Sequence, residues 1–179
     1  MYYDVKAGNA VAESGAWRLP GSPFEELRSL VRLDWAAMDH WFEEDEEVFV
    51  HPRDPHTRVD ILASSRHVDI VINGVTVASS DRPRLLFETG LPTRYYLPLT
   101  DVRLDLLRPS ATTSLCPYKG EANYYTVEAD GEVHEDAVWT YRSPVPESQK
   151  IIGLVAFYNE RVDIIVDGVV QERPKTKFS

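Results

Sequence analysis

Three two-residue turns that end in glycine constrain the fold of this chain more than any other feature. Asn73-Gly74, Asp130-Gly131 and Asp167-Gly168 each separate two segments of strand-like composition. Both residues of such a turn adopt positive φ, and the resulting twist matches that of paired antiparallel strands. The 12 prolines divide the chain into pieces too short for long helices. The pattern predicts a mainly β protein built from antiparallel sheets.

Helical signals are confined to the N-terminal part of the chain. The segment Ser22-Pro23-Phe24-Glu25 combines a capping residue, a proline and an acid, and precedes Leu27, Leu30 and Val31 on one helical face. A second short helix is predicted from Asp34 to Trp41. Two shorter strands are predicted at Tyr95-Tyr96-Leu97 and Val102-Arg103-Leu104.

The chain repeats part of itself. Residues 2–17 align with residues 124–139 at 16 positions, of which 7 are identical, whereas chance would give about one. Residues 58–61 also resemble residues 161–164. The spacing from the aligned tryptophan to this second match is 41 positions in the first copy and 22 in the second, so the first copy carries a 19-residue insertion. We therefore expect a turn near Gly8-Asn9 that superposes on the later one.

This repeat predicts three parts. Residues 1–64 form a partial N-terminal repeat with a helical insertion, residues 66–171 form a complete domain, and residues 172–179 form a C-terminal tail. A half module leaves strand edges open, so we expect residues 1–64 to pack on the complete domain or on a partner chain. An alternative is that the natural gene starts upstream of Met1.

Composition excludes several classes of protein. A formal net charge of −10 argues against nucleic-acid binding and against docking on anionic lipid. The apolar stretch from Ile151 to Phe157 is too short to span a bilayer. The single cysteine, Cys116, excludes an internal disulfide and a multi-cysteine zinc site. These features predict a cytoplasmic protein that binds no cofactor and no metal.

Several motifs in the second half of the chain occur together in one known family. They are Phe87-Glu88-Thr89-Gly90-Leu91-Pro92, Arg94-Tyr95-Tyr96, Thr113-Ser114-Leu115-Cys116-Pro117-Tyr118-Lys119-Gly120, Ala122-Asn123-Tyr124-Tyr125, Ala137-Val138-Trp139-Thr140-Tyr141 and Gly153-Leu154-Val155-Ala156-Phe157-Tyr158. In this order they resemble the domain-of-unknown-function family 427. The resemblance covers residues 66 to about 171.

The resemblance implies a β-tent arrangement, in which two antiparallel sheets meet at a steep angle, and it makes tandem copies plausible. It implies no settled activity. The family is sometimes labelled nucleotidyltransferase-like, but this chain has no Gly-Ser step followed by paired aspartates to hold a metal and a triphosphate. Tent-fold relatives often carry a four-cysteine zinc site, which one cysteine cannot form.

The segment Cys116-Pro117-Tyr118-Lys119-Gly120 offers the clearest candidate chemistry. Lys119 could activate Cys116 as a thiolate nucleophile or hold an anionic ligand. The alternative is a buried structural thiol at the end of a strand, with Pro117 and Gly120 shaping a turn. His134 could approach Cys116 in space as a base. If Lys119 serves a ligand rather than the fold, Lys119→Ala should change the unfolding free energy by no more than about 0.5 kcal/mol.

Aromatic residues crowd the same motifs. In strands, Tyr124 and Tyr125 must point to opposite faces, while Trp139 and Tyr141 share a face. These rings either line a pocket for a flat ligand or fill the core between the sheets. We predict a ligand site made by Arg94, Tyr118, Lys119, Tyr125, Trp139 and Tyr141.

Two further clusters have competing interpretations. His51, Asp54 and His56 could hold a metal, although two intervening prolines favour an extended, solvated loop. Arg82, Arg84, Arg94 and Arg103 could hold a phosphate or carboxylate, or could pair with surface carboxylates.

The sequence leaves three functions open. The first is a small-molecule binding domain for an anionic or aromatic ligand. The second is an enzyme that uses Cys116 or Lys119, and the third is a protein-interaction module of repeated β units.

Overall fold

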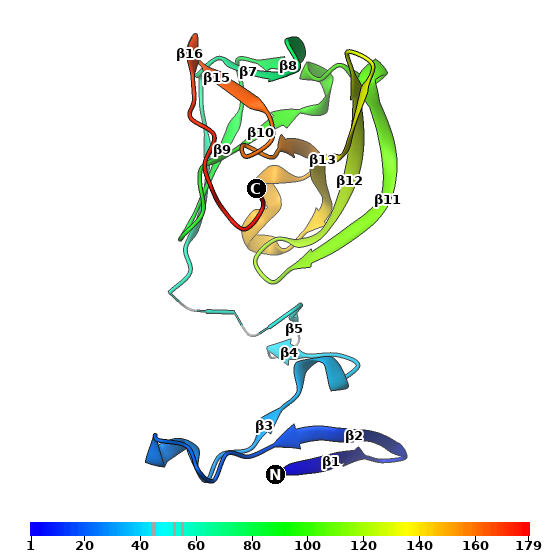
Figure 1. Ribbon diagram of the computed structural model, residues 1–179, viewed down its shortest axis with the longest axis vertical. Helices are drawn as coiled ribbons and strands as arrows, with labels where there is room; N and C mark the ends of the chain where they lie inside the picture. The colour runs from blue at the N-terminus through cyan, green and yellow to red at the C-terminus, as the bar shows by residue number, and fades with distance from the viewer. Residues whose placement is uncertain (44–45, 52, 55) are drawn as a thin grey trace. The chain divides into compact units, whose positions relative to one another are not determined.

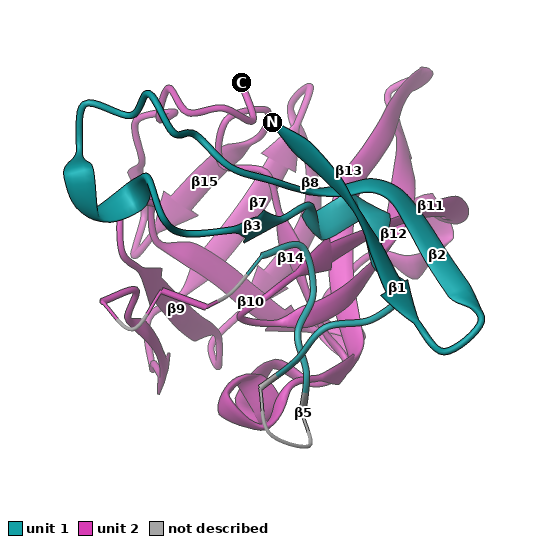
Figure 2. Cartoon of the chain, turned by 90° about the horizontal axis from the view of Figure 1, so that it is seen from below, with its two compact units in different colours: residues 1–52 teal, residues 53–179 magenta. Residues whose placement is uncertain are grey.

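The strands follow the turns that punctuate the sequence. The protein is described by a computed structural model that covers residues 1–43, 46–51, 53–54 and 56–179 (Figure 1). These residues form two compact units, 1–52 and 53–179 (Figure 2). The mainly β, antiparallel fold predicted from the sequence is confirmed.

The N-terminal unit is built on one hairpin. Its elements are β1 (Tyr2–Ala7), β2 (Ala10–Trp17), η1 (Glu25–Leu27), β3 (Arg32–Leu33), η2 (Trp35–Ala37), β4 (Phe42–Glu43) and β5 (Glu46–Glu47). Strands β1, β2 and β3 form an antiparallel sheet, and β4 and β5 form a two-stranded ribbon. Gly8 has a φ of 60°, which the tight turn requires. The strand, turn and strand predicted over residues 2–17 are therefore confirmed.

The predicted helices of this unit are single 3₁₀ turns. The segment after Ser22 reaches only η1, and Leu27, Leu30 and Val31 are 47%, 58% and 56% exposed. A helix this short depends on burial of its apolar face for stability, and these side chains are exposed. In η2 the Asp34 side chain accepts a hydrogen bond from the Ala36 N–H at 3.1 Å. The acidic run at 43–47 includes residues 44 and 45, which lie outside the described residues.

The second unit contains two antiparallel sheets. Its elements are β6 (Val59–Ala63), β7 (Val68–Ile72), β8 (Val75–Ser80), β9 (Arg84–Glu88), β10 (Arg94–Pro98), η3 (Leu99–Asp101), η4 (Leu104–Leu106), β11 (Leu107–Cys116), β12 (Gly120–Ala129), β13 (Glu132–Pro144), η5 (Pro146–Ile151), β14 (Leu154–Phe157), β15 (Asp163–Val166) and β16 (Val169–Val170). A seven-stranded sheet has the order β11-β12-β13-β14-β10-β9-β6, and a four-stranded sheet has the order β16-β15-β7-β8.

The three glycine turns connect β7 to β8, β12 to β13 and β15 to β16, as predicted. All six of their residues have positive φ: Asn73, Gly74, Asp130, Gly131, Asp167 and Gly168. Tyr95-Tyr96-Leu97 lies in β10, which is also as predicted. The strand predicted at 102–104 is wrong. Val102 makes one isolated bridge to Ala78, and the chain then turns into η4.

The seven-stranded sheet has a hydrophobic cluster on each face. The first cluster fills the space against the four-stranded sheet and includes Val127, Val138, Phe157 and Ile70. The second lies on the opposite face, because Trp139 belongs to it while its neighbour Val138 belongs to the first. Strands β11, β12 and β13 curve around this second cluster, and η5 lies within the curve (Figure 1).

Strand β6 determines where the second unit begins. The repeat grouped residues 53–64 with the N-terminal part, but β6 pairs with β9 along its whole length, and Ile61 is buried in the second cluster. Residues 59–63 therefore pack with the second unit. Among the described residues, no helix is long and apolar enough to cross a membrane.

Candidate functional site

Most of the predicted site residues lie on the curved inner face of the seven-stranded sheet. Trp139 and Tyr141 are both buried in the second cluster, and Cys116 packs against it. Tyr125 packs on the first cluster, on the opposite face. As expected from the alternation of side chains along a strand, Trp139 and Tyr141 lie on one face, while Tyr124 and Tyr125 lie on opposite faces. This alternation separates Tyr125 from the other predicted site residues.

Lys119 lies in the turn between β11 and β12. Its N–H donates to the Cys116 carbonyl at 3.3 Å. Gly120 has a φ of 95°, and a side chain there would meet the Ser143 carbonyl. The Lys119 ammonium group donates to Glu88 Oε2 at 2.5 Å, and both side chains are 9% exposed. The lysine is therefore buried and neutralised rather than open to a ligand or to solvent.

Arg94 forms a second buried ion pair. Its guanidinium donates to both oxygens of Glu160 at 2.7 and 2.8 Å and to Asn159 Oδ1 at 3.0 Å. The Arg94 and Glu160 side chains are 6% and 0% exposed. Burial acts to raise the pKa of Glu160, but hydrogen bonds from Arg94 and Thr176 outweigh it and hold that pKa below its usual range. Arg94 also lies 5.6 Å from the centroid of the Trp139 ring.

The phenol groups of the second cluster stay protonated. Burial raises the pKa of Tyr96, Tyr141 and Tyr158 well above the usual range. Tyr96 accepts a hydrogen bond from the Trp139 indole N–H at 2.9 Å. Neutral phenols in this setting donate or accept hydrogen bonds and are poor general bases.

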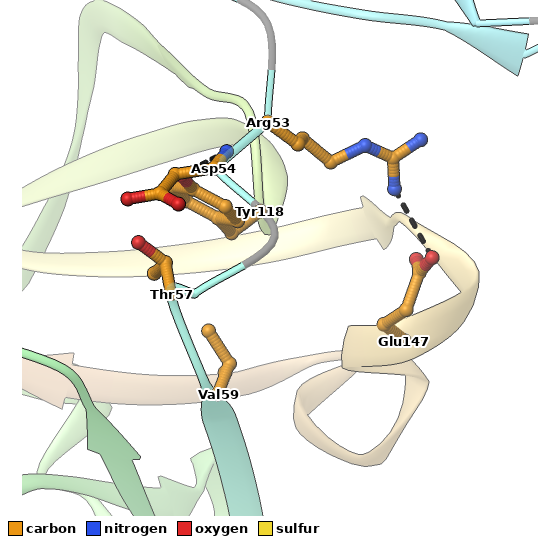
Figure 3. Close-up of a pocket in the computed structure, with 6 residues that line it drawn as sticks. All are labelled: Arg53, Asp54, Thr57, Val59, Tyr118 and Glu147. Carbon is orange, nitrogen blue, oxygen red and sulfur yellow. Dashed lines mark hydrogen bonds and ion pairs between the residues drawn. The ribbon is translucent and has the colours of Figure 1, made fainter.

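A hollow of about 210 Å³ lies at the end of the inner face. It is lined by Arg53, Asp54, Thr57, Val59, Tyr118 and Glu147 (Figure 3). Arg53 donates to Glu147 at 3.0 Å on one side, and the Asp54 N–H donates to the Tyr118 hydroxyl at 3.0 Å on the other. Val59 also packs against the second cluster and pairs across strands with Glu88. The hollow is therefore connected to the Glu88–Lys119 pair through Val59.

Among the described residues, no hydrogen bond joins the Cys116 thiol to a histidine or lysine. The His134 ring lies 3.4 Å from the Asn73 amide and 4.0 Å from a Glu132 oxygen, beside the 130–131 turn. His134 is therefore not the base for Cys116 that the sequence permitted.

The structure answers only in part what the two other predicted clusters do, namely the histidine segment and the group of arginines. Across the described residues, no group of three or more His, Cys, Asp and Glu side chains could hold a metal ion, and Pro52 and Pro55 of the histidine segment lie outside them. Arg82 and Arg103 pair with Asp101 and Asp105 at 2.9 and 2.6 Å. These pairs favour the surface-carboxylate interpretation of the arginines.

Sequence reasoning missed the hydrogen-bonding partners of Lys119 and Arg94. Glu88, Asn159 and Glu160 neutralise or orient the two predicted cations, yet none was a candidate. Glu88 stands inside the quoted Phe-Glu-Thr-Gly motif, and Asn159-Glu160 directly follows another. A search for a buried counter-ion within or beside each motif could have found them.

A protein-family model described as a domain of unknown function (DUF427) matches residues 60–168. No curated protein matches the chain.

Proposed function

The chain belongs to the domain-of-unknown-function family DUF427, and on that premise we propose that it is a small-molecule binding domain. The site is the hollow lined by Tyr118, and its ligand is a small polar molecule with a planar part. The single observation that carries this proposal is the hollow itself, which combines an aromatic ring, a threonine and a guanidinium group within about 210 Å³.

The lining residues define the ligand chemistry. The Tyr118 ring provides a flat surface, while Thr57 and Arg53 provide polar groups from the segment that leads into β6 (Figure 3). The Thr57 hydroxyl has no hydrogen-bond partner among the described residues. Sites for drug-sized ligands usually occupy roughly 300–1,000 Å³. The ligand is therefore smaller than these, or remains partly in solvent.

The buried ion pairs argue against an anionic ligand at Lys119 or Arg94. Each cation already has a carboxylate partner at 2.5 to 2.8 Å. Taking one partner from a buried pair costs about 3–5 kcal/mol, and an anion would have to compensate for that. Of the two ligand types that the sequence allowed, the structure favours the aromatic one.

An enzymatic role for Cys116 or Lys119 has less support. Glu88 neutralises Lys119, and no base contacts the Cys116 thiol among the described residues. A titration of Cys116 with a thiol reagent across pH decides this alternative. An ordinary thiol pKa, or complete protection from the reagent, would contradict it.

Two substitutions test the hollow. Thr57→Val removes its free hydroxyl at constant volume, and Thr113→Val makes the same change at an exposed position on β11. Native mass spectrometry of purified protein should detect a bound small molecule, or a fragment screen by NMR should find planar polar ligands. Thr57→Val should weaken their binding at least tenfold and Thr113→Val should not. Equal binding by both variants would refute the site.

We also infer that the N-terminal sheet is a partial copy of β12, β13 and β14. Tyr2 faces Trp17 in β1 and β2, as Tyr124 faces Trp139 at the aligned positions. Both hairpins shift register at aligned positions, between residues 3 and 5 and between residues 125 and 127. Strand β3 then pairs with residues 16 and 17 of β2 as β14 pairs with residues 138 and 139 of β13.

Local details of the two bulges also agree. Ser14 and Asp136 stand at aligned positions and have φ of 52° and 50°. The Ser14 N–H donates to the Asp4 carboxylate at 2.8 Å, and the Asp136 N–H donates to the Thr126 hydroxyl at 3.5 Å. Asp4→Thr, which introduces the residue of the other copy, should therefore keep the Ser14 amide protected from hydrogen exchange. Asp4→Leu should expose this amide, and equal protection in both variants would contradict the equivalence.

One observation favours the interaction module as a second function. Large apolar side chains of the N-terminal unit are exposed, among them Tyr2 at 72%, Phe24 at 64% and Leu30 at 58%. Exposed apolar side chains on such a small unit are typical of an interaction surface.

The β-tent arrangement and the cytoplasmic location stay predictions from the sequence.

A further inference from the structure

The final segment of the chain covers part of the inner face. After β16 the chain forms no further strand, and residues 174–179 (red in Figure 1) turn back toward the seven-stranded sheet. Within the part of the chain that the structure describes, two side chains join this segment to the inner face. The Phe178 ring lies 5.6 Å from the Arg94 guanidinium carbon and 5.8 Å from the Tyr158 ring centroid. The Thr176 hydroxyl donates to Glu160 Oε1 at 2.6 Å.

The surface beneath the segment is built and largely buried. The Trp139 and Tyr158 ring centroids are 4.6 Å apart, and Arg94 lies over both rings. Because Glu160 and Asn159 already bind the guanidinium group in the plane of its N–H donors, only its flat face remains for an aromatic ring. Glu160 provides the acceptor of the site, since its carboxylate accepts a hydrogen bond from a hydroxyl group such as that of Thr176.

We propose that residues 174–179 are a built-in occupant of a second ligand site, formed by Arg94, Trp139, Tyr158 and Glu160. The segment places there one aromatic ring and one hydroxyl donor, so the site takes a small aromatic molecule that carries a hydroxyl group. This site is separate from the hollow and does not depend on it. No residue that lines the hollow belongs to it.

The segment is suited to be displaced. Among the described residues, it is held by the Phe178 ring contacts and the Thr176 hydrogen bond, whereas its other hydrogen bonds are local, such as the Phe178 N–H to the Thr176 hydroxyl at 3.1 Å. Lys175 and Lys177 are exposed. Ordering a segment of this length costs conformational entropy that so few contacts barely offset. The cover therefore competes with a free ligand of the same chemistry.

The test compares Phe178→Ala with the unchanged segment. Trp17, Trp35 and Trp41 are replaced by Phe in all proteins, so that Trp139 fluorescence alone reports binding. The probe is 2-phenylethanol, and 2-cyclohexylethanol is the matched probe without an aromatic face. Phe178→Ala should bind 2-phenylethanol at least tenfold more tightly than the parent chain does. Lys175→Ala, which changes an exposed residue of the same segment, should bind like the parent.

A second variant and a peptide complete the test. Thr176→Val keeps the ring but removes the donor to Glu160, and should strengthen probe binding several-fold. A peptide of residues 171–179 should compete with 2-phenylethanol on Phe178→Ala. Equal binding by the parent and both variants, or equal binding of the two alcohols, would overturn the proposal. So would loss of folding in Phe178→Ala, because the segment would then be part of the core.

Discussion

The buried Lys119–Glu88 pair predicts that Lys119 contributes to the stability of the fold, which is the opposite of the outcome expected if Lys119 served only a ligand. Lys119→Met keeps the length of the aliphatic stem and removes the charge, which leaves the Glu88 carboxylate buried at 9% exposure without its partner. Breaking such a pair costs about 3–5 kcal/mol. The carboxylate can also relieve the penalty by taking a proton. At pH 7 protonating a carboxyl group of ordinary pKa costs about 4 kcal/mol, which sets the upper limit.

The same reasoning predicts a pH dependence. At pH 5 the cost of protonation falls to about 1 kcal/mol. We therefore expect Lys119→Met to lower the free energy of unfolding by about 3–4 kcal/mol at pH 7 and by about 1–2 kcal/mol at pH 5. The double variant Lys119→Met/Glu88→Met should recover to within about 1 kcal/mol of the parent at both pH values, because no unpaired charge remains.

Urea denaturation measures these values. Trp139 is the only tryptophan of the second unit, so its fluorescence follows that unit once the other three are replaced by Phe. Arg103→Met is the matched control. It breaks an ion pair whose side chains are 54% and 61% exposed, and should cost less than about 1 kcal/mol. A loss within about 0.5 kcal/mol for Lys119→Met at pH 7, or a double variant no more stable than the single one, would refute the reasoning.

Four further predictions can be tested on the purified protein. Trp139→Ala should cost about 3–5 kcal/mol, since the ring is 7% exposed in the second cluster; a urea midpoint close to that of the parent would contradict this. A fragment of residues 53–179 should be as stable as the same unit within the full chain. A fragment of residues 66–179 should be less stable, because it lacks β6 and Ile61; equal thermal midpoints of the two fragments would show that β6 is dispensable. The Arg82 hydrogen bond lowers the pKa of Asp101 to about 2, so this carboxylate stabilises the fold above its ordinary pKa and loses that effect as the pH falls toward 2. Asp101→Asn should therefore cost about 1–2 kcal/mol at pH 5 and almost nothing at pH 2, and a pH-independent cost would be evidence against the pair. A strong chelator should leave the melting temperature unchanged, because one cysteine cannot form a structural zinc site; a fall of several degrees in a calorimetric scan would contradict it.

The sequence by itself determined the local features of the fold, which depend on residues that are close together along the chain. Turn chemistry at Asn73-Gly74 and Asp167-Gly168 specified hairpins, because few residues tolerate two successive positive φ values. The alternation of side chains along a strand separated Tyr124 from Tyr125 and placed Trp139 beside Tyr141. These outcomes need no knowledge of distant contacts.

The tertiary structure decided which charges remain available. Lys119 and Glu88 are 31 positions apart, and Arg94 and Glu160 are 66 apart. No local pattern predicts these pairs, because they depend on how β9, β10 and β14 meet in one sheet. Lys119 and Arg94, the two cations of the predicted ligand site, each have a buried carboxylate partner, which argues against an anionic ligand at either residue.

Contacts at a distance also decided the helices and the hollow. The predicted helix after Ser22 needed a partner for Leu27 and Leu30, and both side chains remain exposed. The hollow brings Arg53, Thr57 and Val59 together with Tyr118 and with Glu147 of η5. These residues are far apart in the sequence and meet only when the seven-stranded sheet has curved. Local propensity can specify a turn or the face of a strand, whereas burial and pairing depend on the whole folded domain.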